Sequence, residues 1–133
     1  MRRMFMLVGM AMVMLVVAAG VALAVTKTCS NNPCNGTDGD DVLYEQIGNG
    51  EKDRIYGHDG EDDMSAALYT NDEDKLFGQR HRDRIVVNDA DSRDLADGGR
   101  GRDTCRIDRG DRTRSCASVR VAAAGLLPQG FGD

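Results

Sequence analysis

The hydrophobic positions of the chain fall into two regions with different patterns. The first is an apolar run from residue 4 to residue 25, which follows Met1-Arg2-Arg3 and contains Ala22-Leu23-Ala24 near its end. A short basic segment, an apolar stretch and small residues are typical of an export signal, so we expect a signal peptide over residues 1–24. An apolar run of about 20 residues also matches the thickness of a bilayer, and an uncleaved N-terminal anchor is the alternative.

In the second region, apolar residues recur at one place in a repeated unit. Seven nine-residue windows, which start at residues 36, 48, 57, 69, 78, 89 and 98, carry Asp at the sixth position and an apolar residue at the eighth. The eighth positions are Leu43, Ile55, Met64, Leu76, Ile85, Ala96 and Cys105. Self-similarity of this kind indicates a repeat architecture over residues 36–106.

These units resemble the glycine-rich nonapeptide repeat of hemolysin-type (RTX) calcium-binding proteins, G-G-x-G-x-D-x-U-x, in which U is large and apolar. Residues 98–106, GGRGRDTCR, fit this pattern closely. The flanking segments, Cys29 to Thr37 and Asp103 to Cys116, resemble those of short secreted bacterial proteins that carry such an array. The resemblance implies an all-β fold, a parallel β-roll in which six residues of each unit turn around Ca²⁺ and three form a strand.

The residue types suit calcium. Ca²⁺ takes six to eight oxygen ligands, which Asp carboxylates and turn carbonyls supply, and glycine lets the backbone aim its carbonyls inward. The candidate metal ligands are the sixth-position aspartates and the glycines of the best-formed units: Asp41, Asp53, Asp62, Asp74, Asp83, Asp94, Asp103, Gly36, Gly39, Gly57, Gly60, Gly98 and Gly101.

The spacing of the sixth-position aspartates alternates, with intervals of 12, 9, 12, 9, 11 and 9 residues. If two units make one turn, Asp41, Asp62, Asp83 and Asp103 stack along one edge and Asp53, Asp74 and Asp94 along the other. We expect a short roll of about three to three and a half turns. The extra residues extend an alternating apolar pattern, which predicts longer strands near 42–47, 63–68, 84–88 and 104–107 and short strands near 54–56, 75–77 and 95–96.

The units differ in how well they match a calcium-binding turn. The units that begin at Gly36 and Gly57 keep both glycines, so the best site is expected between them, and Asp62 is expected to contribute more than Asp94. The unit at Gly78 has His81 in place of the second glycine. On the other edge glycines are few, but Asp72, Glu73, Asp89 and Asp91 offer side-chain oxygens instead.

Four cysteines follow the expected leader, which favours an oxidising, extracellular location and two disulfides. Three pairings are possible, and the spacing favours Cys29–Cys34 and Cys105–Cys116. We expect disulfide-bearing caps over residues 25–35 and 107–118, at opposite ends of the roll, and a flexible tail over residues 119–133.

Charge divides the repeat into halves. Residues 36–77 hold 13 acidic and 3 basic residues, whereas residues 78–120 hold 8 acidic and 11 basic residues. The net charge is -5, and it becomes -7 when Arg2 and Arg3 leave with the leader. Because stacked carboxylates repel and apolar residues are few, metal binding and folding are expected to be one event, with arginines neutralising part of the second half.

We therefore expect a secreted, monomeric, non-enzymatic protein that binds Ca²⁺ and folds into a β-roll on export. The chain has no Ser-His-Asp or HExxH pattern, and neither cysteine pair has zinc-site spacing. The alternative is an extracellular adhesion or envelope-interaction module whose degenerate roll is held by disulfides and arginine pairs. Its partner would be an anionic surface polymer or another extracellular protein; nucleic acid is not expected, because Arg100 to Arg120 lacks interleaved aromatic residues.

Overall fold

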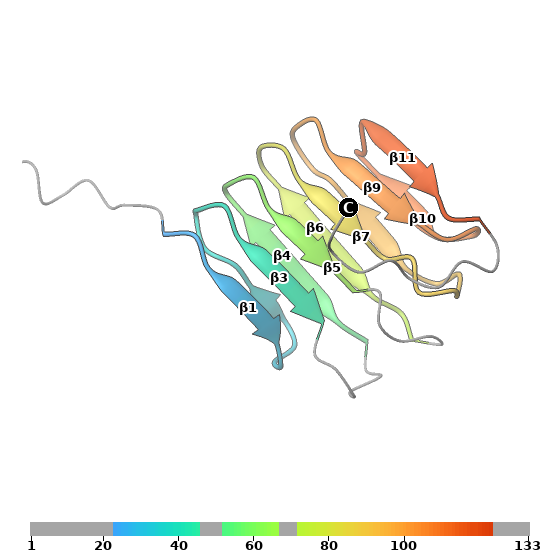
Figure 1. The fold of residues 1–133 in the computed structure, drawn as a ribbon, viewed down its shortest axis with the longest axis horizontal. Coiled ribbons are helices and arrows are strands. Elements are labelled where there is room, and N and C mark those ends of the chain that lie inside the picture. Colours follow the sequence, from blue (N-terminus) through green and yellow to red (C-terminus); the bar gives the residue numbers. More distant parts are fainter. Residues whose placement is uncertain (1–22, 46–51, 67–71, 124–133) are drawn as a thin grey trace, which may run out of the picture.

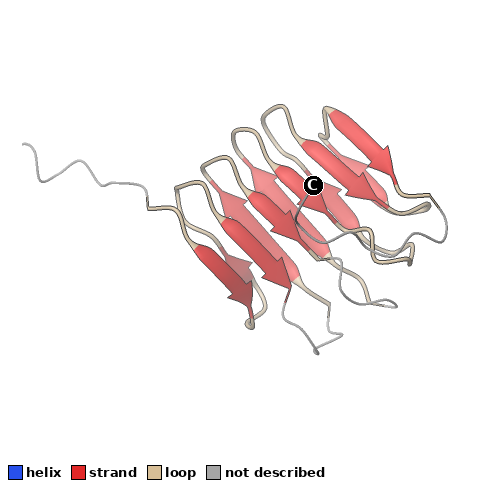
Figure 2. Ribbon diagram, viewed as in Figure 1, coloured by secondary structure: helices blue, strands red, loops and turns tan. Residues whose placement is uncertain are grey.

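The computed structural model describes residues 23–45, 52–66 and 72–123, and these residues form strands, turns and loops without a helix (Figures 1 and 2). Nothing in this part of the chain is a helix long and apolar enough to cross a membrane. The expected leader lies outside the described residues except for its last two. The strands are β1 (Thr26–Cys29), β2 (Cys34–Asn35), β3 (Val42–Glu45), β4 (Arg54–His58), β5 (Asp63–Ser65), β6 (Lys75–Gln79), β7 (Arg84–Val86), β8 (Leu95–Asp97), β9 (Thr104–Ile107), β10 (Arg112–Arg114) and β11 (Ser118–Val121).

The strands form two parallel sheets, one with the order β1-β3-β5-β7-β9-β11 and one with the order β10-β8-β6-β4-β2. Successive strands alternate between the sheets, so each pair makes one coil of a β-solenoid (Figure 1). The register pairs Leu43 with Met64, Met64 with Ile85 and Ile85 with Cys105. Equivalent positions in adjacent coils are therefore two repeat units apart, which confirms the predicted roll.

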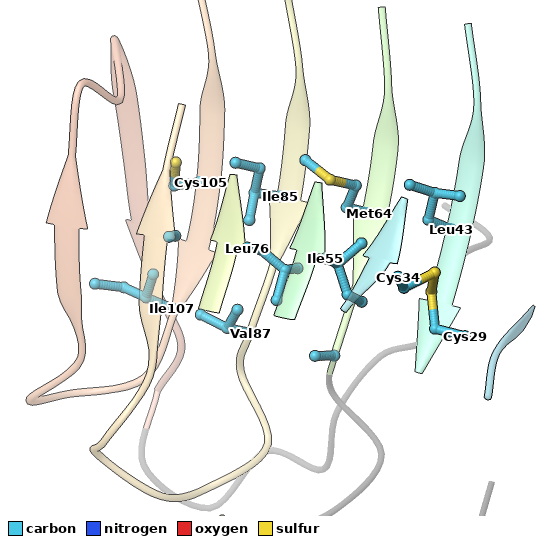
Figure 3. Close-up of a cluster of buried hydrophobic side chains, with 12 residues drawn as sticks. Cys29, Cys34, Leu43, Ile55, Met64, Leu76, Ile85, Val87, Cys105 and Ile107 are labelled. Carbon is cyan, nitrogen blue, oxygen red and sulfur yellow. A yellow bond between two sulfur atoms is a disulfide. The ribbon is translucent and has the colours of Figure 1, made fainter. Parts of the chain in front are cut away.

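The core is a thin layer of side chains between the two sheets (Figure 3). All seven eighth-position side chains are fully buried, as the repeat predicted. A second inward-facing row, two residues further along the first sheet, contains Cys29, Ala66, Val87 and Ile107. Glu45 pairs with Cys29 in this row and is only 1% exposed, so the core of the first coils includes a carboxylic acid.

The strand lengths match the prediction at β8 and β9 and differ from it at β4 and β6, and the expected strand ends at residues 46–47 and 67–68 lie outside the described residues. Strands β5 and β7 contain three residues, whereas β4 and β6 in the second sheet contain five. Strands β4 and β6 are longer because pairing continues past the first glycine of the next unit, so that His58 lies opposite Gln79. In the first sheet, the N–H groups of Ala66 and Val87 still donate to the adjacent coil, although their residues lie beyond the assigned strands.

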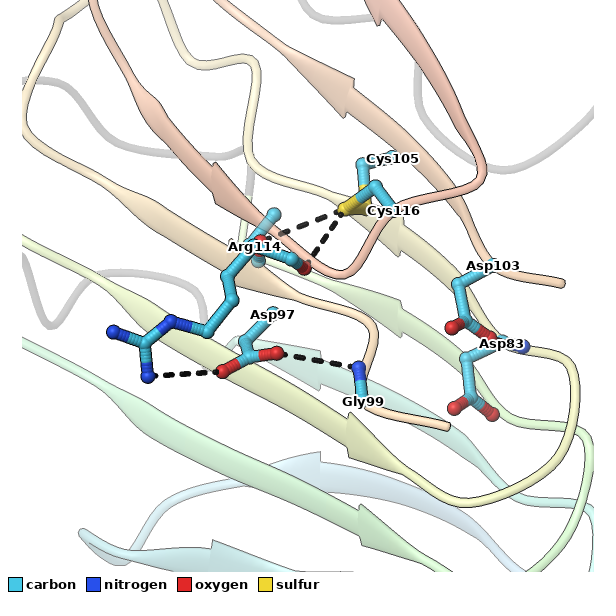
Figure 4. The surroundings of a disulfide bond; sticks show 8 residues. Asp83, Asp97, Gly99, Asp103, Cys105, Arg114 and Cys116 are labelled. Atoms are coloured by element: carbon cyan, nitrogen blue, oxygen red, sulfur yellow. Dashed lines mark hydrogen bonds and ion pairs between the residues drawn. A yellow bond between two sulfur atoms is a disulfide. The ribbon is translucent and has the colours of Figure 1, made fainter. Parts of the chain in front are cut away.

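Each end of the roll carries a disulfide. The predicted pairing is confirmed: Cys29 is bonded to Cys34 and Cys105 to Cys116, with Cα atoms 5.4 and 5.9 Å apart (Figures 3 and 4). Disulfides persist in oxidising compartments, so these bonds indicate an oxidising, extracellular environment.

The caps are themselves coils of the solenoid. Strands β1 and β2 extend the two sheets at one end, and β10 and β11 extend them at the other. The tail predicted to begin at residue 119 is therefore wrong for residues 119–121, because Ser118–Val121 pairs in parallel with β9. Residues 124–133 lie outside the described part of the chain.

Candidate metal centre

The tight turns at the top of Figure 1, which we call the first edge, carry a ladder of aspartates. Asp41, Asp62, Asp83 and Asp103 are at most 2% exposed. The backbone N–H of each donates to the Oδ1 atom of the next, at 2.9, 3.0 and 2.9 Å. The repeat thus places one buried carboxylate in every coil, as the spacing predicted.

The longer loops at the bottom of Figure 1, the second edge, carry an equivalent ladder. The backbone N–H of Asp53 donates to Asp74 Oδ1 at 2.7 Å, that of Asp74 to Asp94 Oδ1 at 2.8 Å, and that of Asp94 to Asp111 Oδ1 at 3.2 Å. Asp111 was not among the predicted ligands, since it lies outside the seven units. The Gly110-Asp111 pair is the signal that could have identified it, because the C-terminal cap repeats the turn of the preceding coils.

Five aspartates of these ladders have a buried outer oxygen that lacks a hydrogen-bond partner among the described residues. This holds for Oδ2 of Asp62, Asp83, Asp103, Asp74 and Asp94. Buried polar atoms in native proteins are almost always satisfied, and an unpaired buried carboxylate is costly. The repetition of this feature from coil to coil indicates that a positively charged partner belongs in the turns.

Glycine at the first position of a unit makes room for this oxygen. A Cβ atom on Gly57 would lie 2.1 Å from Asp62 Oδ2, and one on Gly78 would lie 2.1 Å from Asp83 Oδ2. The same Cβ positions approach the carbonyl oxygens of the next coil, Gly78 O at 3.0 Å and Gly98 O at 2.7 Å. Carboxylate and carbonyl oxygens converge there, and this donor set fits a hard cation such as Ca²⁺.

Burial raises the pKa of these carboxyl groups, so they ionise less readily unless a positive charge lies nearby. Burial raises the pKa of Asp62 to about 6 and that of Asp83 to about 7. On the second edge burial raises the pKa of Asp74 to about 8 and that of Asp94 to about 9, against the lowering effect of a backbone hydrogen bond, and neighbouring acids add a smaller increase. The second edge therefore has the greater need for a cation.

The second edge also brings three carboxylates together in three places. The groups are Glu45 with Asp72 and Asp74, Asp72 with Asp89 and Asp91, and Asp91 with Asp94 and Asp111; in each, one oxygen per residue lies within 4.8 Å of the others. Two oxygens bound to one Ca²⁺ ion are at most about 5 Å apart. We call these residues the acidic row: Glu45, Asp72, Asp74, Asp89, Asp91, Asp94 and Asp111.

The structure places the site expected to be best, between Asp41 and Asp62, on two adjacent coils of the first edge. There the Asp41 carboxylate already accepts hydrogen bonds from the N–H groups of Thr37 and Val25, at 2.5 and 2.7 Å. Within residues 23–45, 52–66 and 72–123, every group of three carboxylates lies on the second edge.

Two other predicted features lie apart from the acidic row. Glu73 forms ion pairs with Lys52 and Lys75, at 3.2 and 3.0 Å, and does not belong to any of the three groups. Arg100 and Arg102 are exposed, so the arginines of the last unit face solvent.

His81 replaces the second glycine of its turn without disrupting it. Its backbone φ is 76°, and its Nδ1 accepts a hydrogen bond from Gly60 N–H at 3.1 Å. The imidazole thereby links two coils of the first edge.

The arrangement as a whole is a β-solenoid whose clustered, buried acidic residues can bind metal ions. Oxygen donors are concentrated on its two edges, and the second edge holds the denser set. Comparisons with protein-family models, curated proteins and solved structures find no match to this chain.

Proposed function

We propose that the protein is a secreted calcium-binding β-roll of the hemolysin (RTX) type, whose turns bind Ca²⁺ and whose folding is completed by it. The observation that carries the proposal is the row of buried carboxylate oxygens without partners, one on each of several successive coils. Ca²⁺ accepts oxygen ligands in a forgiving geometry, which suits turns that differ in sequence. The two disulfides support action outside the cell.

The residues of the turn have separate tasks in this proposal. The Oδ1 atom of Asp62 is held by the backbone of the preceding coil, at 2.9 Å from Asp41 N, which fixes the direction of Oδ2. Gly57 leaves the space beside that oxygen open. A bound cation would supply the positive charge that lets neighbouring aspartates ionise together.

Circular dichroism of the exported, disulfide-bonded protein tests the proposal. In a chelator such as EGTA we expect a weak β signal, and in millimolar Ca²⁺ a strong β signal and a higher melting temperature, because metal binding and folding are linked. Mg²⁺ at the same concentration is the control for a general effect of charge. An unchanged spectrum and melting temperature on addition of Ca²⁺ would overturn the proposal.

A second candidate is an adhesion or envelope-interaction module with a roll that needs little calcium. It is favoured by three ion pairs between the second and third coils: Arg80 with Asp59 at 3.3 Å, Arg82 with Glu61 at 2.7 Å and Arg84 with Asp63 at 3.4 Å. These pairs connect the acidic and basic halves without metal. Because they are largely exposed, each contributes little, and we rank this function second. A full β signal in EGTA would favour it.

A further inference from the structure

We propose that the acidic row binds a chain of three Ca²⁺ ions that share Asp72 and Asp91 as bridging ligands, so that the ions bind cooperatively. This rests on the proposed function only in taking Ca²⁺ as the ion. It differs from the proposed turn sites in using side chains outside the repeat pattern, namely Glu45, Asp72, Asp89 and Asp91, and in coupling one site to the next.

The connection between the sites follows from the membership of the three groups. Asp72 belongs to the first and second groups, and Asp91 belongs to the second and third. Each group also joins neighbouring coils: Glu45 ends β3, Asp72 precedes β6, Asp91 precedes β8, and Asp111 precedes β10. A carboxylate has two oxygens, so one residue can serve an ion on each side.

Asp72 is the strongest evidence that the row takes ions. The residue is only 4% exposed, and neither of its carboxylate oxygens accepts a hydrogen bond from another of the described residues. The Oδ2 atoms of Asp74, Asp89 and Asp94 are also buried without a hydrogen-bond partner. Four adjoining carboxylates therefore present unsatisfied oxygens in one place, which hydrogen bonding within the described protein does not explain.

The charges agree with three divalent ions. The acidic row contains seven carboxylates, and three Ca²⁺ ions would bring about six positive charges. Nearby bases are largely engaged elsewhere: Lys52, Lys75 and Arg112 all pair with Glu73. Arg93 acts on Asp72 and lowers its pKa, but burial has the larger, opposite effect.

Sharing of ligands predicts cooperative binding. The first ion would fix Asp72 or Asp91 and thereby order one half of the next site, which lies one coil, about 4.8 Å, away. A coupling free energy between sites gives a sigmoidal binding curve. Loss of a shared residue would damage two sites, whereas loss of a terminal residue would damage one.

Native mass spectrometry and a Ca²⁺ titration of the complete disulfide-bonded protein test this inference. We expect Asp72→Asn and Asp91→Asn each to remove two bound ions and make the curve hyperbolic. Glu45→Gln and Asp111→Asn should each remove one ion. The matched control is Asp97→Asn, which makes the same substitution at an aspartate that pairs with Arg114 and belongs to none of the three groups, and which should change neither the ion count nor the shape of the curve.

The outcomes separate this inference from the proposed function. If Asp72→Asn and Asp91→Asn remove no more ions than Glu45→Gln, while the wild-type chain binds Ca²⁺ and folds with it, the shared row is wrong and the proposed function stands. If the wild-type chain binds no Ca²⁺, both are wrong. Asp91 is only half-buried, so its variant tests the sharing even where Asp72→Asn does not fold.

Discussion

At the scale of the residue, the pattern of Asp and Gly gives each turn one buried carboxylate and the space for it. All seven predicted aspartates are buried. Glu45 and Asp111 were not predicted as ligands. In the sequence Glu45 continues the alternating pattern of a strand. Only the fold shows that it is the last residue of β3 and that its buried side chain lies with the carboxylates of the second edge. Asp111 lies in a turn that is structurally equivalent to the turns of the repeat, which only the pairing of β10 with β8 shows.

Gly57→Ala tests one of the tight contacts between a first-position glycine and its aspartate. We expect the free energy of unfolding to fall by about 1–3 kcal/mol, because the new methyl group would lie 2.1 Å from Asp62 Oδ2. The measurement is chemical denaturation at a fixed Ca²⁺ concentration. In an Asp62→Ala background the same substitution should be less damaging, since the carboxylate is gone. An equal loss in both backgrounds would show that the clash is not with Asp62.

At the scale of the element, alternation of units predicted two sheets and two edges, and both are present. The lengths of β4 and β6 could not be predicted from the number of residues between units. These strands continue through Gly57 and Gly78 because each pairs with the strand of the adjacent coil. The sequence also gave a misleading indication of which edge is better suited to bind metal ions. Glycine content favours the first edge, but the geometry gathers carboxylates on the second, where each group joins the loops of two neighbouring coils.

Asp62→Asn and Asp94→Asn compare the two edges directly. The sequence favours Asp62 as the more important ligand, whereas the structure favours Asp94, because only Asp94 has two further carboxylates in its group. We expect Asp94→Asn to raise the Ca²⁺ midpoint of folding roughly tenfold, about 1.4 kcal/mol, and Asp62→Asn to raise it less. The midpoint is followed by circular dichroism. A larger shift for Asp62→Asn would restore the order expected from glycine content.

At the scale of the whole molecule, the roll contains buried acids and few apolar residues, and its halves are joined by charge. The sequence predicted that arginines neutralise the second half. In the structure several of them instead reach back to acids of the first half, as Arg82 does to Glu61 and Arg112 to Glu73. This could not be read from local composition, because partners one or two coils apart are separated by about two or four units of sequence.

The buried acids predict an unusual response to pH in metal-free protein. The pKa of Asp83 is raised to about 7, that of Asp74 to about 8 and that of Asp94 to about 9, whereas an Asp in the unfolded chain titrates near 3.8. The folded state therefore binds more protons at these groups, and the stability that they contribute is full below about pH 4 and is lost as the pH rises towards 9.

Thermal melting in metal-free buffer checks this prediction. The melting temperature should be higher at pH 5 than at pH 8, and saturating Ca²⁺ should weaken or reverse that trend, because a cation favours the ionised carboxylates. Greater stability at pH 8 in the absence of metal would contradict it. The disulfides must remain intact throughout, so that only protonation changes.

The aspartate ladders also have a direction. Along both edges the donor N–H belongs to the earlier coil and the accepting carboxylate to the later one, as in Asp41 to Asp62 and Asp74 to Asp94. Each coil thus donates to a carboxylate about 20 positions further along the chain, and the first-edge ladder ends at Asp103, two residues before Cys105 of the C-terminal disulfide (Figure 4). The two ends of the stack are therefore not equivalent: in each ladder the donor N–H groups point towards the C-terminal end and the accepting carboxylates towards the N-terminal end.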